Sequence, residues 1–391
     1  MQDFVLDSLR PVWATINISN FLHNLALLRT FAPHSALLVV LKANAYGHGA
    51  NALASVALQA GAEMLGVATL QEALEIRAHF PSAPILILGY TQPALLALAA
   101  EHNIRVCVAT HEVAQALLQA HRAPKVHVKI DTGMHRIGFE CNEESLELIA
   151  KMARANIDIE GVFTHFARAD EENLAPTDKQ HALFVAFLDS LKARGIAPRY
   201  VHCANSAAIF AKQYAHSMVR AGIAAYGIAP CALAHGLLPV MSLNARIVRI
   251  HDVPKGEGVS YGATFVASDN YCRVATLPFG YADGYMRLLS NRASMLVGSE
   301  RAPVVGNVCM DQCMIDVSHI ATAHVGQDVL VFGQNDMGAL PVSELSELIG
   351  TIPYEIVCAI STRVPRIYAH EGRFYTESQW CTQPNPRKES V

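Results

Sequence analysis

The chain has 391 residues, of which 52% are hydrophobic and 16% are charged, and its formal net charge is −4. This length and apolar content are sufficient for two domains, or for a barrel with an appended domain. The charge is small and no basic stripe is present, which argues against nucleic acid as a main partner. No window of about 18 residues is free of polar or helix-breaking residues, so a membrane span is not expected.

The cysteines and the N-terminus indicate a reduced, cytoplasmic protein. Residues 1–10 contain two acids and no apolar core, unlike a secretory signal. The nine cysteines form no C-x-x-C pair, and Cys309 and Cys313, with three residues between them, are not a zinc site by themselves. The 18 histidines show no H-E-x-x-H spacing. We therefore expect no metal and no disulfide framework.

From about residue 36 to 230, short apolar runs alternate with segments whose apolar residues recur at spacings of three and four. Eight strands alternating with helices favour a closed (β/α)8 TIM-type barrel over an open doubly wound sheet. No G-x-G-x-x-G opens any of these helices, which argues against a dinucleotide-binding fold. The expected strands are 37–41, 64–68, 85–88, 105–109, 126–130, 159–165, 200–203 and 218–222.

After about residue 240 the pattern changes to short strand-like runs, among them 258–265, separated by Gly, Asp-Gly and Pro, which is typical of a mostly β domain. The segment 11–18 alternates with period two and predicts an upstream strand that could join this domain. We therefore expect a barrel domain at 12–236 and a mostly β domain at 237–391, with residues 1–11 associated with the latter.

Lys42 is the most informative residue, because the apolar run 36–41 ends on its amine. Desolvation at a strand end disfavours the ammonium, and the neutral amine forms imines with carbonyl compounds. The alternative is a lysine whose charge simply extends into water. Functional-type residues at five strand ends favour the first interpretation, because active sites of (β/α)8 barrels lie at that face. These residues are Lys42 and Tyr46, Asp131 and Arg136, His165, Asn205 and Ser206, and Arg220 with Gly222.

Ser206 and the N–H groups of Gly222 and Ile223 lie near the last two strand ends, where barrels commonly bind phosphate. Ser206 could equally be a helix N-cap. A phosphate anchor and an imine-forming lysine together indicate a pyridoxal phosphate site. Arg220 cannot accept a proton from the pyridine nitrogen, and such a cofactor would withdraw electrons weakly. Weak electron withdrawal favours racemisation over transamination.

Racemisation needs a base on each face of the α-carbon. Lys42 is one, and Tyr261 is the candidate for the other, although its pattern also suits a half-buried strand tyrosine. Because Tyr261 lies in the predicted β domain, it must reach the barrel mouth of its own or of a partner subunit.

Two further features, one within strand 126–130 and one directly after it, need an interpretation. Lys129 alternates with His127 and Asp131 on one face, and an inward lysine is costly unless it is paired or modified. An exit of its side chain toward Asp131 is the simpler solution. The triplet Asp131–Gly133 matches the D-T-G of aspartic proteases, but those enzymes need two such carboxylates and the chain has one.

Taken together, the motifs resemble the alanine racemase family over nearly the whole chain. The matching blocks, in order, are residues 42–49, 131–136, 164–167, 204–208, 219–223, 259–262, 280–284 and 309–312.

The resemblance implies a homodimer that racemises L- and D-alanine in composite active sites, with pyridoxal 5'-phosphate as cofactor. It implies that Lys42 carries the cofactor and is the base for the D-enantiomer, and that Tyr261 of the partner subunit is the base for the L-enantiomer. Arg220 would contact the pyridine nitrogen, and His165 would link Arg220 to that tyrosine. The remaining implied roles are phosphate binding by Tyr46, Ser206, Gly222, Ile223 and Tyr354, substrate carboxylate binding by Arg136 and Met310, the entry channel at Tyr281, and a carbamylated lysine at Lys129.

Two alternatives remain open. A racemase or decarboxylase of serine or of a basic amino acid would use the same fold, but a longer side chain needs a roomier or acidic pocket than Tyr261 and Tyr354 suggest. A single-barrel pyridoxal phosphate carrier would lack the β domain and therefore the second base.

Overall fold

The computed structural model describes residues 10–268 and 271–381. These residues form two compact units. The barrel unit comprises 22–45 and 50–238, and the β unit comprises 10–21, 46–49 and 239–381. The predicted association of residues 1–11 concerns mainly residues outside the described ranges. Within those ranges, no helix has both the length and the apolar composition needed to cross a membrane.

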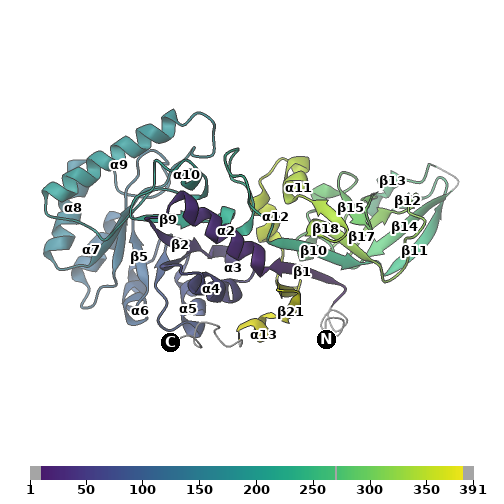
Figure 1. The fold of residues 1–391 in the computed structure, drawn as a ribbon, viewed down its shortest axis with the longest axis horizontal. Helices are drawn as coiled ribbons and strands as arrows, with labels where there is room; N and C mark the ends of the chain where they lie inside the picture. The colour runs from purple at the N-terminus through teal and green to yellow at the C-terminus, as the bar shows by residue number, and fades with distance from the viewer. Residues whose placement is uncertain (1–9, 269–270, 382–391) are drawn as a thin grey trace. The chain divides into compact units, whose positions relative to one another are not determined.

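The barrel unit contains eight parallel strands, which confirms the predicted (β/α)8 fold. Hydrogen bonds join them in the order β8-β7-β6-β5-β4-β3-β2-β9, and Figure 1 shows α7, α8 and α9 outside the strands. Each expected strand is present, with bounds within two residues of the prediction. The strands are β2 (Ala36–Val40), β3 (Met64–Val67), β4 (Ile85–Ile87), β5 (Arg105–Val108), β6 (Val126–Lys129), β7 (Ile159–Phe163), β8 (Tyr200–His202) and β9 (Met218–Ala221). The helices are α2 (Ile18–Phe31), α4 (Ala50–Gln59), α5 (Leu70–His79), α6 (Leu96–Glu101), α7 (His111–Gln119), α8 (Glu143–Arg154), α9 (Ala175–Ala193) and α10 (Ser206–Phe210).

The gap between β8 and β9 is bridged by a side chain in place of a regular strand ladder. The Val201 N–H donates to Ser217 Oγ at 2.7 Å, and that hydroxyl donates to the Arg199 carbonyl at 3.2 Å. Further along, the Arg220 N–H donates to the Ala204 carbonyl at 3.1 Å. The barrel is therefore nearly closed.

The barrel strands carry buried polar side chains, whereas barrel interiors are usually filled by branched aliphatic residues. His127, Lys129, His202 and Arg220 are all buried. Gly161 makes room for one of them, because a Cβ there would lie 2.4 Å from His127 Nδ1. Buried polar groups of this kind are stable only when they are hydrogen-bonded to one another.

Glu160, at 5% exposure, anchors three neighbouring strands. Its carboxylate accepts from Arg105 and from Lys125 Nζ at 3.1 Å, and lies 3.5 Å from His127 Nε2. Burial raises the pKa of Glu160, but hydrogen bonds from His127 and Arg105 outweigh burial and hold the pKa well below its ordinary value. The carboxylate therefore stays ionised and ties β5, β6 and β7 together.

The β unit consists of one large sheet, a three-stranded sheet and a hairpin. The large sheet has the order β16-β15-β18-β10-β1-β20-β21, with β19 against β18, the smaller one has the order β11-β14-β17, and β12 pairs with β13. The strands are β1 (Val12–Asn17), β10 (Met241–Arg246), β11 (Arg249–Pro254), β12 (Gly258–Val259), β13 (Phe265–Val266), β14 (Tyr271–Leu277), β15 (Ser294–Val297), β16 (Glu300–Pro303), β17 (Cys313–Asp316), β18 (Asp328–Asn335), β19 (Gly338–Leu340), β20 (Arg366–His370) and β21 (Arg373–Thr376). Strand β1 pairs with β10 and β20, as its alternation suggested.

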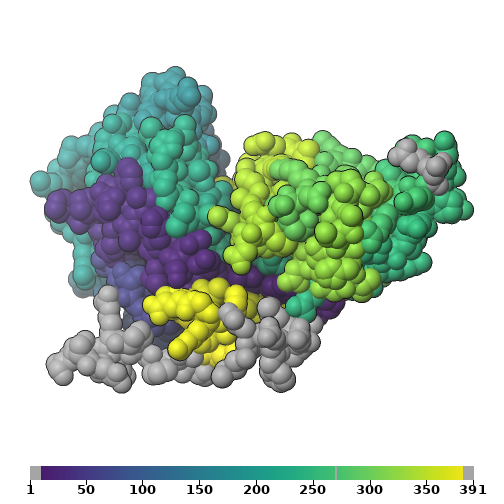
Figure 2. All heavy atoms as spheres, turned by 45° about the vertical axis from the view of Figure 1, so that its right-hand side comes forward, coloured from purple at the N-terminus to yellow at the C-terminus, as the bar shows by residue number. Residues whose placement is uncertain are grey.

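Helices also occur in the β unit, and one predicted strand there is wrong. The helices are α11 (Val342–Ile349), α12 (Pro353–Ala359) and α13 (Glu377–Cys381), and Figure 2 shows the yellow segment that includes β21 and α13 at the surface. The expected strand 258–265 is broken by the short 3-10 helix η3 (Tyr261–Ala263). Ser260, Gly262 and Ala263 have φ of 67°, 73° and 46°, which no strand accommodates.

We predict that Glu160→Gln destabilises the protein by about 3–5 kcal/mol, because it leaves Arg105, whose side chain is only 12% exposed, without its counter-charge. The folded pKa of Glu160 lies below its ordinary value, so its contribution is present above that value and is lost as the pH falls. Urea unfolding should therefore show a smaller loss of stability in acid for the variant than for the native protein. Glu171→Gln, which removes the exposed partner of Arg168, is the control and should leave the stability close to that of the native protein. Equal effects of the two variants would contradict this role of Glu160.

Candidate functional site

The chain leaves β2 in a strained left-handed turn, α3 (Lys42–Tyr46). Ala43, Asn44, Ala45 and Tyr46 all have φ between 51° and 54°. Such a conformation costs roughly 1–2 kcal/mol for each residue other than glycine. A run of four strained residues needs support from its surroundings, and strain of this kind is concentrated at functional sites.

The support comes from Glu72 and Asn44, which the sequence analysis missed. Glu72 Oε1 accepts from the Ala43 N–H at 2.7 Å, and Oε2 accepts from the Ala68 N–H at 2.7 Å. Asn44 Oδ1 accepts from the Ala50 N–H at 2.7 Å. The available signal was the T-x-x-E capping box at the start of α5, where Glu72 is the acidic member.

Lys42 is exposed, so the predicted desolvation of its amine is wrong for the chain by itself. The strand that precedes it is buried, but the left-handed turn carries Lys42 out of that apolar environment. Its charge still reaches the barrel mouth, because it lowers the pKa of His165.

Arg220 on β9 is buried and is held by acceptors from β7, β8 and the residues that follow them. Nη1 donates to His202 Nδ1 at 3.0 Å and to the His202 carbonyl at 3.1 Å. Nη2 donates to the carbonyls of Thr164 and Cys203 and to His165 Nδ1, at 2.9–3.0 Å. These bonds use only the two Nη atoms, which leaves the Nε–H for a further acceptor. Burial lowers the pKa of Arg220 to about 10, so it remains a cation at neutral pH.

The arginine sets the protons of two buried histidines that the sequence analysis did not assign to the site. Because Arg220 only donates, His202 Nδ1 must accept, and the neutral ring carries its proton on Nε2. That Nε2–H donates to His127 Nδ1 at 2.9 Å, so His127 carries its proton on Nε2, toward Glu160. Burial lowers the pKa of both rings, which keeps them neutral. A directional polar chain therefore runs from Arg220 to Glu160.

His165 follows β7 and accepts from Arg220 at Nδ1, so its Nε2–H points to another group. Burial lowers its pKa well below the ordinary value. The charges of Arg220, Lys129, Arg136 and Lys42 lower it further, in that order. Four cationic groups therefore surround one neutral imidazole, an arrangement suited to anionic ligands.

Lys129 is buried, and the simpler interpretation, an exit of its side chain toward Asp131, is wrong. Its Nζ lies 5.9 Å from the centroid of the Phe163 ring. Asp131 Oδ1 instead accepts three backbone N–H groups, at 3.0–3.1 Å, from the loop that leads to Arg136. Burial lowers the pKa of Lys129 to about 8, so its amine loses a proton more readily than that of an ordinary lysine.

Ser206 joins the two last strand ends of the barrel. Its Oγ accepts from the N–H groups of Gly222 and Ala224, at 3.0 and 3.3 Å. The alternative role of Ser206 as a helix cap is wrong, because Asn205 caps α10 by accepting from the Ala208 N–H. Ser206 is therefore placed beside the 3-10 turn η2 (Ile223–Tyr226), which Gly222 precedes.

The candidate residues of the β unit fall into two groups. The rings of Tyr46 and Tyr354 make an edge contact with centroids 6.0 Å apart. Tyr261, Tyr281 and Met310 lie on adjacent loops, because the Tyr281 N–H donates to the Cys309 carbonyl and Ser260 Oγ lies 3.3 Å from Cys309 Sγ.

All three side chains of the second group are exposed: Tyr261 by 74%, Met310 by 53% and Tyr281 by 43%. An exposed apolar patch of this kind is typical of a surface that binds another molecule. The interpretation of Tyr261 as a half-buried strand tyrosine is therefore wrong.

Comparison with known proteins gives consistent matches over the length of the chain. The family model "alanine racemase, N-terminal domain" matches residues 16–230, and "alanine racemase, C-terminal domain" matches residues 240–368. An alanine racemase of Desulfovibrio desulfuricans is 45% identical over 368 residues, covering 92% of this chain and 98% of the relative. One of Methanococcus maripaludis is 40% identical over 371 residues, covering 92% and 99%.

Solved structures agree. Alanine racemase from Clostridium difficile has a TM-score of 0.89 at 36% identity and covers 94% of this chain and 97% of its own. The Bacillus anthracis alanine racemase, solved with bound L-Ala-P, has a TM-score of 0.88 at 36% identity and covers 93% and 96%.

We predict that Arg220→Lys destabilises the protein by at least about 2 kcal/mol, although the charge is kept. An ammonium has three donors on one nitrogen and cannot reach all five acceptors, and each buried acceptor left unpaired costs about 1–3 kcal/mol. Chemical denaturation measures the change. The exposed Arg122→Lys is the matched control and should stay within about 0.5 kcal/mol of the native value. A native-like stability of Arg220→Lys would mean that the five bonds do not hold the barrel interior.

Proposed function

The chain belongs to the alanine racemase family and interconverts the enantiomers of alanine, and on that premise we propose the cofactor and the residues through which it does so. The cofactor is pyridoxal 5'-phosphate, carried by the barrel domain at 12–236. The domain at 237–391 supplies a second base to the site of a partner subunit. The observation that carries the proposal is the buried guanidinium of Arg220, which donates to His165 Nδ1 at 3.0 Å, at a barrel mouth where the charges of Lys129, Arg136 and Lys42 also act on His165.

The residues present suit the cofactor. The phosphate is a dianion, and the Ile223 N–H, the Ser206 hydroxyl and the phenols of Tyr46 and Tyr354 are neutral donors for its oxygens. The Gly222 N–H, which donates to Ser206 Oγ in this structure, joins them when it exchanges that acceptor for a phosphate oxygen. The unused Nε–H of Arg220 is a donor for the pyridine nitrogen. When bound, pyridoxal phosphate links to the amino group of the substrate and its ring withdraws electrons, which acidifies the α C–H bond.

Arg220 limits how far that withdrawal goes. A guanidinium donates and cannot accept, and it cannot itself lose a proton, so a nitrogen facing it stays without one. The α-proton is then returned quickly, which favours racemisation over competing reactions. The polar chain through His202 and His127 to Glu160 keeps Arg220 oriented for this role.

Lys42 removes or returns the proton on one face of the α-carbon, and Tyr261 of the partner subunit does so on the other. His165 can support that tyrosine because its Nε2 carries a proton, and donation to a phenolate stabilises the anion. Burial and the surrounding cations keep His165 from becoming a second cation there.

Arg136 and the backbone of Met310 hold the substrate carboxylate, and Tyr281 lines the entry channel. The 74% exposure of Tyr261 supports a composite site, because a catalytic base needs to be enclosed when it acts.

The lowered pKa of Lys129 supports carbamylation, since carbon dioxide reacts only with a neutral amine, and the resulting anion would hold Arg136. The scattered cysteines, which form no C-x-x-C pair, support a cytoplasmic location.

We expect Lys42→Ala to lose both racemase activity and the absorbance near the visible edge that covalent attachment of the cofactor produces. The lysine is the only proposed attachment point, so added pyridoxal phosphate should be removed by dialysis. An absorbance spectrum of the dialysed protein measures this. Lys151→Ala, on the exposed face of α8, is the control and should keep the spectrum. A yellow chromophore that persists in Lys42→Ala would contradict the assignment of Lys42 as the attachment point of the cofactor.

We expect Tyr261→Phe to reduce α-hydrogen exchange of L-alanine by about 10²–10⁴-fold, the usual contribution of a general base, and to spare exchange of D-alanine. Deuterium incorporation into each enantiomer, followed by NMR, measures the asymmetry. Tyr271→Phe, at another exposed tyrosine of the β unit, should behave as the native protein. Equal losses for both enantiomers would remove the two-base mechanism.

The same variants test the composite site. Mixed dimers of Lys42→Ala and Tyr261→Phe subunits contain one site with both bases. Random exchange makes half of the dimers mixed, so the mixture should recover about one quarter of the native activity. A mixture that stays inactive after verified exchange would show that each site is built from one chain.

A further inference from the structure

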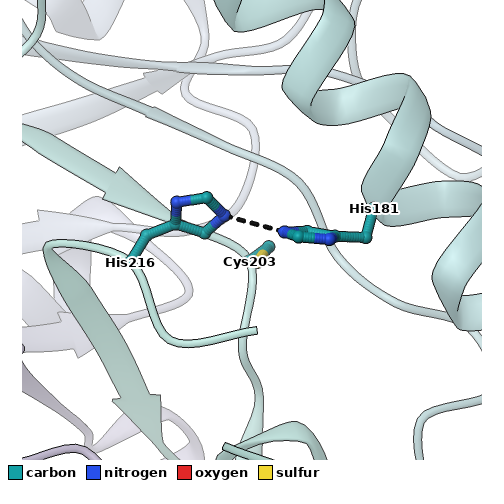
Figure 3. Close-up of side chains that lie close together, drawn as sticks. All are labelled: His181, Cys203 and His216. Atoms are coloured by element: carbon teal, nitrogen blue, oxygen red, sulfur yellow. Dashed lines mark hydrogen bonds between the residues drawn. The ribbon is translucent and has the colours of Figure 1, made fainter. Parts of the chain in front are cut away.

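Three side chains with metal-binding atoms meet in the barrel unit, and none has a role in the proposed mechanism. They are His181 on α9, Cys203 directly after β8, and His216, two residues before β9 (Figure 3). Their ligand atoms all lie within 4.8 Å of one another, and the two imidazoles are in contact through Nε2 atoms 2.9 Å apart. Figure 3 shows Cys203 close to the line that joins the two rings.

Packing holds these side chains in place. The ring of His181 makes an edge contact with Tyr214, with centroids 5.3 Å apart, and the ring of His216 makes one with Phe184 at 6.0 Å. Cys203 is fully buried, and its Sγ lies 3.1 Å from the Tyr214 carbonyl. The three metal-binding side chains therefore come from separate segments that the fold already holds in place, as in preorganised metal sites.

We propose that His181, Cys203 and His216 form a binding site for one borderline-soft divalent cation, Zn²⁺, with water in a fourth, tetrahedral position. Two imidazoles and a thiolate are typical zinc ligands. Zinc–nitrogen bonds of 2.0–2.1 Å place two ligand nitrogens roughly 3.3 Å apart, so the rings need to separate only slightly from their present contact. Both histidines are partly exposed, which leaves room for the water.

Each Zn²⁺ ion that binds releases one proton from the site. The imidazole that now donates through Nε2 moves that proton to its own Nδ1, so the number of protons on the two rings stays the same. The Cys203 thiol releases its proton to solvent and becomes the thiolate ligand. The cluster then carries one net positive charge, and the carboxylate of Asp178, which already acts electrostatically on His181, offsets part of it.

The cation site shares Cys203 with the group of residues that binds Arg220, because the Cys203 carbonyl accepts from Arg220 Nη2 at 2.9 Å. A cation bound at Cys203 links α9 to this backbone. We therefore expect zinc to raise the melting temperature of the protein, since a ligand that binds only the folded state stabilises it.

The test uses the untagged full-length protein with its cofactor, stripped with a chelator and dialysed against Zn²⁺. We expect one zinc per chain by elemental analysis. Competition with a chromophoric chelator should show that His181→Gln and His216→Gln each weaken binding by at least about 100-fold, since even outer-shell partners of a metal change affinity by 10–100-fold. With Co²⁺, the difference spectrum against the zinc form should contain a thiolate-to-cobalt band that Cys203→Ser lacks.

The controls are His121→Gln, at an exposed histidine outside the cluster, and Cys107→Ser, at a buried cysteine elsewhere in the barrel. Both should bind zinc as the native protein does. The proposal is overturned if zinc does not bind stoichiometrically, or if the two histidine variants retain native affinity. If Cys203→Ser fails to fold, the half-exposed His181→Gln decides the question alone, because binding and the melting shift should both disappear in it.

Discussion

A buried guanidinium, that of Arg220, governs the interior of the barrel. A cation removed from water needs acceptors for its donors, and the residues at the ends of β7 and β8 provide them for both Nη groups as carbonyls and imidazoles. Because Arg220 never accepts, it dictates the tautomers of His202 and, through it, of His127. One residue therefore sets the direction of every proton along a chain that ends at Glu160.

The same constraint shapes the electrostatics of the mouth. The acceptors around Arg220 are neutral, and the carboxylate of Glu160 lies at the far end of the chain of imidazoles. The positive charge at the mouth is therefore not cancelled by the acceptors of Arg220, and Arg136 and Lys42 add to it. A barrel mouth of this kind favours a phosphate and a carboxylate, which are the anionic groups of the proposed cofactor and of the substrate.

Backbone strain is concentrated where the chemistry is proposed. Four residues after Lys42 adopt the left-handed conformation, and Glu72 on a neighbouring helix accepts from the Ala43 N–H of this turn. On the proposed mechanism, this turn orients the catalytic amine and begins the segment that carries Tyr46. The strained turn therefore lowers stability locally, and the hydrogen bond to the Glu72 carboxylate offsets part of that loss.

The amino-acid sequence by itself determined the barrel, the β-rich second half and the strand ends that carry Lys42, His165 and Arg220. Hydrophobic periodicity is a local signal, and it predicts buried parallel strands well. It could not predict the break at Tyr261, because three residues with positive φ interrupt a run of strand-forming side chains. Only the tertiary structure decided the roles of Glu72, His202 and the His181–Cys203–His216 cluster. These residues are far apart in sequence and acquire their partners only when the barrel closes, so no local pattern contains their contacts.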